Sequence, residues 1–74
     1  MENAKDTQNK LLLRHLQQFG SITSMEAYEL YGITRLSGRI YDLRQMGYAI
    51  KGVTESSVNR YGKKVKYRRY SLAA

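Results

Sequence analysis

Two helical patterns in the middle of the chain are separated by only three residues, 32–34, and this spacing constrains the fold more than any other feature. The first of these patterns covers residues 23–31 and begins with a capping box. In this motif the Thr23 hydroxyl and the Glu26 carboxylate each bond the backbone N–H of the other residue. The second covers residues 35–46, and we expect Thr34 to cap it. A three-residue turn holds two such helices at a steep angle, which makes a helix-turn-helix unit.

A third helical pattern precedes this unit, and all three patterns have an apolar side. We expect the first helix to begin at a cap formed by Asp6 or Thr7 and to end near Phe19, before Gly20. Its apolar side on a helical wheel consists of Leu12, Leu13, Leu16 and Phe19. The expected inner faces of the second and third helices are Ala27, Leu30 and Tyr31, and Leu36, Ile40 and Leu43. These faces predict a three-helix core.

After Gly47 the pattern changes from helical to extended. Residues 48–54 and 65–72 are rich in β-branched and aromatic side chains, and the polar residues 55–64 between them include turn formers. We therefore expect a β-hairpin with a long loop, and a short extended link at residues 21–22. An isolated hairpin is only marginally stable in water, so this one must pack on the helices. The residues expected to cover the core are Tyr48, Ile50, Tyr70 and Leu72.

The positive charge of the chain is concentrated near its end. Lys and Arg number 13 against 6 Asp and Glu, which gives a net charge of +7. Residues 56–74 contain no acidic side chain, and their basic ones are Arg60, Lys63, Lys64, Lys66, Arg68 and Arg69. Such a segment suits a polyanionic partner. The alternative is a solvated strand that charge keeps soluble.

The outward face of the third helix is the first part of the candidate site. Turning Leu36, Ile40 and Leu43 inward leaves a polar face with short side chains at its start, which fits the major groove of duplex DNA. Arginines can pair with guanine or phosphate, hydroxyls with either, and Tyr41 can stack or donate to a phosphate. The candidate contacts on this helix are Thr34, Arg35, Ser37, Gly38, Arg39, Tyr41 and Arg44.

Gly38 is unusual in this helix. A glycine inside an exposed helix costs about 1 kcal/mol relative to alanine. We interpret it as a place where DNA approaches too closely for a side chain, and the alternative is neutral drift.

The turn of the hairpin is the second part of the candidate site. Flexible cations at a hairpin tip can follow phosphates or enter a minor groove. The alternative is a solvent-exposed hairpin without a partner. The candidate contacts here are Asn59, Arg60, Tyr61, Lys63, Lys64 and Lys66.

The sequence favours neither catalysis nor metal binding. It contains no cysteine, which excludes disulfides and thiolate metal sites. The single histidine, His15, is expected to be structural, and Asp42 is expected to pair with Arg39 or Arg35 rather than to act as an acid. We expect no catalytic residues, no metal, no cofactor and no enzymatic activity. With no apolar run that could span a membrane, we expect a cytoplasmic protein.

Several segments resemble small winged helix-turn-helix proteins of phages and prophages. The resemblance rests on residues 20–27, 32–44, 47–48, 59–64 and 70–72. It implies an α+β fold, with a three-helix core and a C-terminal β-hairpin wing over residues 7–72 after a flexible N-terminus at residues 1–6. It further implies a DNA-binding role in phage gene regulation or excision, in the cytoplasm of a bacterial host. The family commonly has alanine where this chain has Gly38.

Two other readings remain open. The first is a protein-interaction module, such as a phage-encoded inhibitor of a host or anti-phage nuclease, for which Met25, Tyr28 and Met46 could form an exposed apolar patch. The second is RNA binding. We see no dedicated dimerisation helix and therefore expect a monomer or a weak homodimer, with double-stranded DNA as the main partner.

Overall fold

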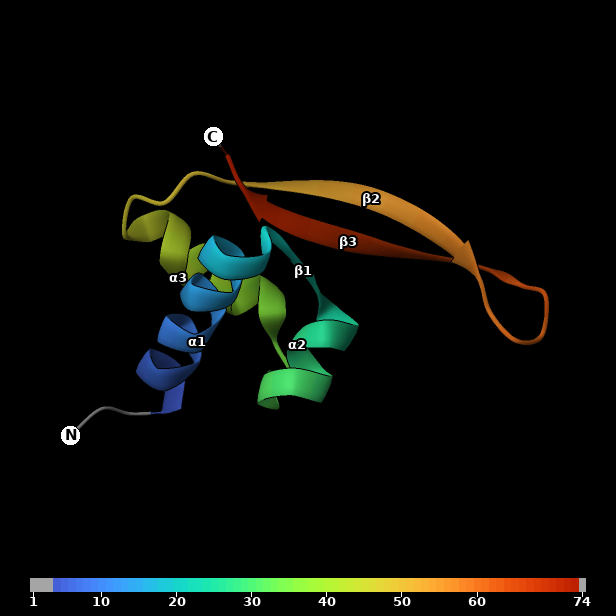
Figure 1. The fold of residues 1–74 in the computed structure, drawn as a ribbon, viewed down its shortest axis with the longest axis horizontal. Helices are drawn as coiled ribbons and strands as arrows, with labels where there is room; N and C mark the ends of the chain where they lie inside the picture. The colour runs from blue at the N-terminus through green and yellow to red at the C-terminus, as the bar shows by residue number, and fades with distance from the viewer. Residues whose placement is uncertain (1–3, 74) are drawn as a thin grey trace.

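The computed structural model describes residues 4–73, which form three helices and a three-stranded antiparallel sheet (Figure 1). The elements in chain order are α1 (Ala4–Phe19), β1 (Ser21–Thr23), α2 (Ser24–Tyr31), α3 (Leu36–Gln45), β2 (Ile50–Val58) and β3 (Lys64–Leu72). The helices pack together at the base of the sheet, and the β2–β3 hairpin projects beyond α2 into solvent (Figure 1). The expected α+β fold with a three-helix core and a hairpin is confirmed.

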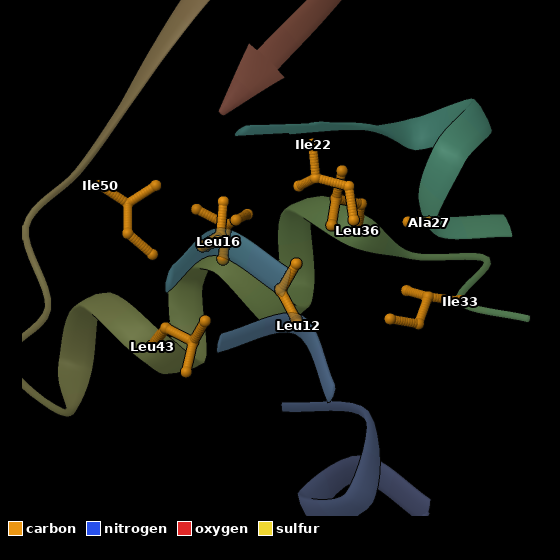
Figure 2. Packing of buried hydrophobic residues seen from close by; sticks show 9 residues of the cluster. Leu12, Leu16, Ile22, Ala27, Ile33, Leu36, Leu43 and Ile50 are labelled. Carbon is orange, nitrogen blue, oxygen red and sulfur yellow. The ribbon is translucent and has the colours of Figure 1, made fainter. Parts of the chain in front are cut away.

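The core lies between the three helices and the base of the sheet (Figure 2). All three residues of the predicted stripe on α3 are buried, which fixes the opposite face of that helix toward solvent. Ile33, in the turn between α2 and α3, is also buried. The buried apolar residues are Leu12, Leu16, Ile22, Ala27, Ile33, Leu36, Ile40, Leu43 and Ile50.

Three residues that were expected to face the core are exposed instead. Phe19, the last residue of α1, is 66% exposed, and its ring lies 4.8 Å from that of His15. Leu30 is 59% exposed, since α2 buries only Ala27 and half-buries Tyr31. Tyr48 precedes β2 and is exposed, whereas Ile50 joins the core as predicted.

The helix-turn-helix unit forms at the predicted signals. In the capping box, the Thr23 hydroxyl accepts from the Glu26 N–H at 3.3 Å, and the Thr23 N–H donates to the Glu26 carboxylate at 2.9 Å. Gly32 has φ of 68°, a left-handed conformation that ends α2, and its N–H bonds the Tyr28 carbonyl at 2.9 Å.

The expected bounds of two helices are wrong by a few residues. Arg35, not Thr34, is at the N-cap of α3 and makes no side-chain capping bond, and the helix ends at Gln45. The first helix begins at Ala4, before the expected cap at Asp6 or Thr7. Residues 1–3 of the expected flexible N-terminus lie outside the described residues, so that division stays a prediction.

His15 joins three elements of the core. Its ring is buried, with Nε2 3.1 Å from the Ser21 carbonyl of β1 and Nδ1 2.7 Å from the Tyr31 hydroxyl of α2. A carbonyl only accepts, so Nε2 carries the proton and donates, and in the neutral ring Nδ1 accepts from Tyr31. This arrangement gives His15 the structural position expected of it.

The hairpin is longer and its turn shorter than predicted. The pairing of β2 with β3 runs from Ile50 with Leu72 to Val58 with Lys64, so the expected loop over residues 55–64 is wrong and the turn is residues 59–63. The expected link at residues 21–22 is the strand β1, which pairs with the end of β3.

Candidate nucleic-acid interface

The outward face of α3 is open to solvent. Arg35, Ser37 and Tyr41 are exposed, as is Thr34 just before the helix, and no other described element covers them. Arg35, Ser37 and Tyr41 border a shallow hollow on the helix surface, which is also lined by Gly38, Arg39 and Asp42. The burial of the opposite side of the helix in the core holds this face in place, because the helix cannot rotate without exposing the apolar stripe.

Gly38 has no packing role within the described chain. A Cβ added at this position would meet no atom within 4 Å. The backbone there is not in the left-handed region, so alanine could adopt the same conformation. The glycine therefore leaves free space on the outer side of α3 without being required by the fold.

Arg39 and Asp42 lie at the side of the outward face that is next to α1, and their side chains are largely buried. Arg39 Nη2 is 3.1 Å from Asp42 Oδ2, and the two side chains are only 18% and 17% exposed. The same carboxylate oxygen lies 3.4 Å from the amide nitrogen of Asn9, which is buried on α1. The predicted i, i+3 pair is thus present, and it lies beside the α1–α3 contact.

Arg44 is also engaged within the molecule. Its Nε and Nη2 both donate to the carbonyl oxygen of Ile50, at 3.1 and 2.8 Å. The guanidinium therefore joins the last turn of α3 to the first residue of β2. Arg44 is one of the candidate DNA contacts predicted from the sequence, which carries no signal for this acceptor because the acceptor depends on where β2 begins.

Asn59 shapes the hairpin tip. Its side-chain oxygen accepts from the backbone N–H of Tyr61 at 2.9 Å and of Lys63 at 3.1 Å, and its own N–H bonds the Lys63 carbonyl at 2.9 Å. Gly62 has φ of 78°, which favours glycine at this point of the turn. Asn59 therefore orders the loop that presents the neighbouring side chains.

The cations of the hairpin lie on an exposed surface. Arg60, Tyr61 and Lys63 are exposed at the tip, where Tyr61 is 79% exposed, and Lys64 and Lys66 are exposed at the start of β3. Alternate residues of a strand share a face, so Lys64 and Lys66 continue the same face of β3 that carries Leu72 over the core. This face changes from apolar to cationic where the hairpin leaves the helices.

A profile of the winged helix-turn-helix domain family matches residues 7–74. The chain belongs to the winged helix-turn-helix family. Neither the curated proteins nor the solved structures that were searched contain a match. In this winged helix domain, α2 and α3 are the helix-turn-helix and β2–β3 is the wing. Membership suggests DNA binding, and domains of this kind are typically non-enzymatic.

Two further arginines of the wing, Arg68 and Arg69, have partners within the domain. Arg69 Nε bonds the Glu55 carboxylate at 2.9 Å, and its Nη1 lies 3.5 Å from Glu26 and 3.2 Å from the Ser21 hydroxyl. This hydrogen bond lowers the pKa of Glu55 below its ordinary value. Arg69 therefore joins the wing to the start of α2, with its charge compensated.

Arg68 lies across the base of the wing. Its guanidinium carbon is 5.9 Å from the centre of the Tyr70 ring, and its Nη1 donates to the Thr54 hydroxyl at 3.2 Å. A Cβ at Gly52 would come within 2.5 Å of Arg68 Nη2. Gly52 lies inside the predicted strand at residues 48–54. A glycine in that position was the one signal in the sequence for the close approach of Arg68.

Residues 4–73 offer no cluster of three His, Asp or Glu side chains that could hold a metal ion. None of the helices in this described part has the length and apolarity needed to cross a membrane.

Proposed function

We propose that this winged helix domain binds double-stranded DNA, with α3 in the major groove and the wing on the phosphate backbone or in a minor groove. The observation that carries the proposal is the open face of α3, which presents Arg35, Ser37 and Tyr41 opposite a fully buried stripe. Polar side chains on a helix that is fixed by its core are the usual means of reading base edges.

The start of α3 adds a second feature that suits a phosphate. The first intrahelical bonds are those of the Gly38 and Arg39 N–H groups to the Arg35 carbonyl. The Arg35 side chain at the N-cap makes no capping bond, and within residues 4–73 the N–H group of the exposed Ser37 has no acceptor. A helix N-terminus with free N–H groups favours an anion, and the neighbouring Arg35 strengthens that preference.

The wing supplies charge without internal compensation. Among residues 4–73 no carboxylate pairs with Lys63, Lys64 or Lys66, in contrast to Arg69. Unpaired cations on an exposed hairpin contribute to binding by releasing counterions from the phosphate backbone. The wing therefore adds affinity with little sequence preference, while α3 supplies the preference.

We extend the proposal to a role in the cell through the resemblance described above. Small proteins of this kind in phages and prophages suggest a transcriptional regulator or an excision accessory factor, acting in the bacterial cytoplasm as a monomer or a weak homodimer. Footprinting on the DNA upstream of its own gene, together with a recombination assay, separates the two roles.

The central test measures binding of short labelled duplexes by fluorescence anisotropy. Arg35→Ala is expected to relax the preference among duplex sequences by about 5- to 150-fold, a loss of roughly 1–3 kcal/mol at one base pair. Arg14→Ala is the matched control, because Arg14 is an exposed arginine of α1 away from the proposed face. Unchanged preference in Arg35→Ala would show that α3 does not read the bases.

One observation favours a second candidate, a protein-interaction module. Met25 and Tyr28 are 65% and 60% exposed and border a shallow apolar hollow with Ile33 and Thr34. If no duplex binds even at low salt, this reading replaces DNA binding. Direct competition between RNA and DNA duplexes tests the RNA alternative.

A further inference from the structure

One edge of β3 has no neighbouring strand along more than half its length. On the side facing α2, β1 pairs only with residues 69–71. After Thr23 the chain turns away into α2, because the capping box begins the helix there. Among the described residues nothing replaces β1 along Lys64 to Arg68.

The hydrogen-bond pattern of the hairpin identifies which groups point to this open edge. The Asn59 N–H bonds the Lys63 carbonyl, and the Ala73 N–H bonds the Ala49 carbonyl. Bonded pairs alternate along an antiparallel ladder, so Val65 and Tyr67 bond β2. Lys64, Lys66 and Arg68 alternate with the residues that bond β2. Their N–H and C=O groups therefore point to the open edge.

A groove runs beside this edge. It encloses about 620 Å³ between the start of α2 and the wing, and its apolar lining includes Met25, Val65 and Tyr67. Met25 is 65% exposed and Val65 39% exposed, so both are accessible.

The two faces of β3 differ in chemistry along the open edge. Side chains alternate between faces, so Lys64, Lys66 and Arg68 lie on one face and Val65 and Tyr67 on the other. A strand added at the edge would alternate in the same way. Acidic side chains would lie beside the cations, and apolar side chains would enter the groove against Met25.

We propose that the open edge of β3 binds an extended segment of a partner protein in which acidic and apolar residues alternate. This inference is independent of DNA binding by α3. The edge offers both N–H donors and C=O acceptors at strand spacing, and a peptide backbone satisfies both. A phosphate backbone only accepts, so it would leave the carbonyls without partners.

The test uses a blocked synthetic peptide of about six residues, the usual length of a strand, in which glutamate and valine alternate. Amide hydrogen exchange in the whole domain is followed by NMR with and without the peptide. We expect exchange at Lys66 and Arg68 to slow by about tenfold or more, while Val65 and Tyr67, already bonded to β2, change little. Absence of this alternating protection would overturn the proposal.

Two control peptides separate strand pairing from charge attraction. A peptide of the same composition, with its glutamates in one block and its valines in another, keeps the charge but loses the alternation. A peptide N-methylated at the residues facing β3 loses the donors alone. Both are expected to bind at least about tenfold more weakly, a loss of roughly 1.4 kcal/mol. Equal binding of either would refute pairing at the edge.

A pair of variants tests the groove. Met25→Asp places a charge in the groove and is expected to weaken peptide binding about tenfold. Met46→Asp is the control, because Met46 is 62% exposed after α3 and does not line the groove. Exchange of the Leu16 and Leu43 amides verifies that both variants are folded. Equal affinity of the two folded variants would show that the groove is not used.

Discussion

Arg35 and Arg39 lie one turn apart at the start of the same helix, yet of the two only Arg39 has a side-chain partner among residues 4–73. Its pair with Asp42 leaves the two side chains largely buried against α1. The nitrogen Nε of Arg39 has no hydrogen-bond partner among the described residues. The distinction depends on Asn9, which a helical wheel of α3 does not contain, so the sequence could not separate the two arginines.

This difference predicts opposite effects on stability. Arg39→Ala is expected to lower the free energy of unfolding by about 2 kcal/mol, because it removes a charge-assisted hydrogen bond between two largely buried side chains. Arg35→Ala is expected to change it by less than about 0.5 kcal/mol, since Arg35 is exposed. Urea denaturation measures both variants, and similar losses would mean that the contact with α1 contributes little.

Glu55 gives the wing a dependence on pH. Its pKa in the folded state lies below the ordinary value of 4.5, because Arg69 donates a hydrogen bond to the carboxylate and attracts its charge. A lowered folded-state pKa contributes stability that is present above the unfolded-state pKa and is lost as pH falls through the folded-state pKa. We expect the urea midpoint to fall as the pH drops below about 4.3. Glu55→Gln should remove part of this fall, and an NMR titration of the Glu55 carboxyl checks the direction directly.

At the scale of the elements, local signals predicted the helices well and the strands less well. The capping box and Gly32 act within a few residues, so the bounds of α2 could be read from the sequence. The β2 residues Glu55–Val58 carry no alternation of apolar and polar side chains, since this part of the hairpin projects from the core and has no buried face. These residues form a strand because they pair with β3. Sequence patterns do not reveal this pairing.

Helical wheels gave wrong burial predictions for residues near the ends of α1 and α2. A wheel places Phe19 and Leu30 on apolar sides, but it carries no information on how far the neighbouring elements extend. Both residues are exposed. For the site, the wheel predicted that Arg35, Ser37 and Tyr41 face solvent, and they are exposed, while the acceptor of Arg44 required the position of β2.

Gly38 allows a prediction about α3 as an element. Gly38→Ala should stabilise the helix by about 1 kcal/mol, because alanine has the higher helix propensity and its methyl group meets no atom of the domain. If DNA approaches this position, the same change should weaken duplex affinity. Thermal unfolding and anisotropy are measured on one preparation. Higher stability with unchanged affinity would support neutral drift at this site.

The charges of the whole molecule predict how binding responds to salt. Each phosphate contact contributes a slope of about −0.9 in a plot of log affinity against log salt. Lys63→Ala combined with Lys64→Ala should make this slope less steep by about 2 and weaken all duplexes alike. The matched control is Arg14→Ala with Lys51→Ala, two exposed cations away from the wing tip. Equal slopes for the two double variants would place the contacts elsewhere.

Arg44 has a consequence for the shape of any bound duplex. Arg44 donates two hydrogen bonds to the carbonyl of Ile50, the first residue of β2, and so holds the base of the wing against α3. The distance between α3 and the wing is therefore set before any partner binds. A duplex that touches both has to conform to that span. Its stiffness then enters the affinity, and flexible base steps that the protein never touches favour one sequence over another.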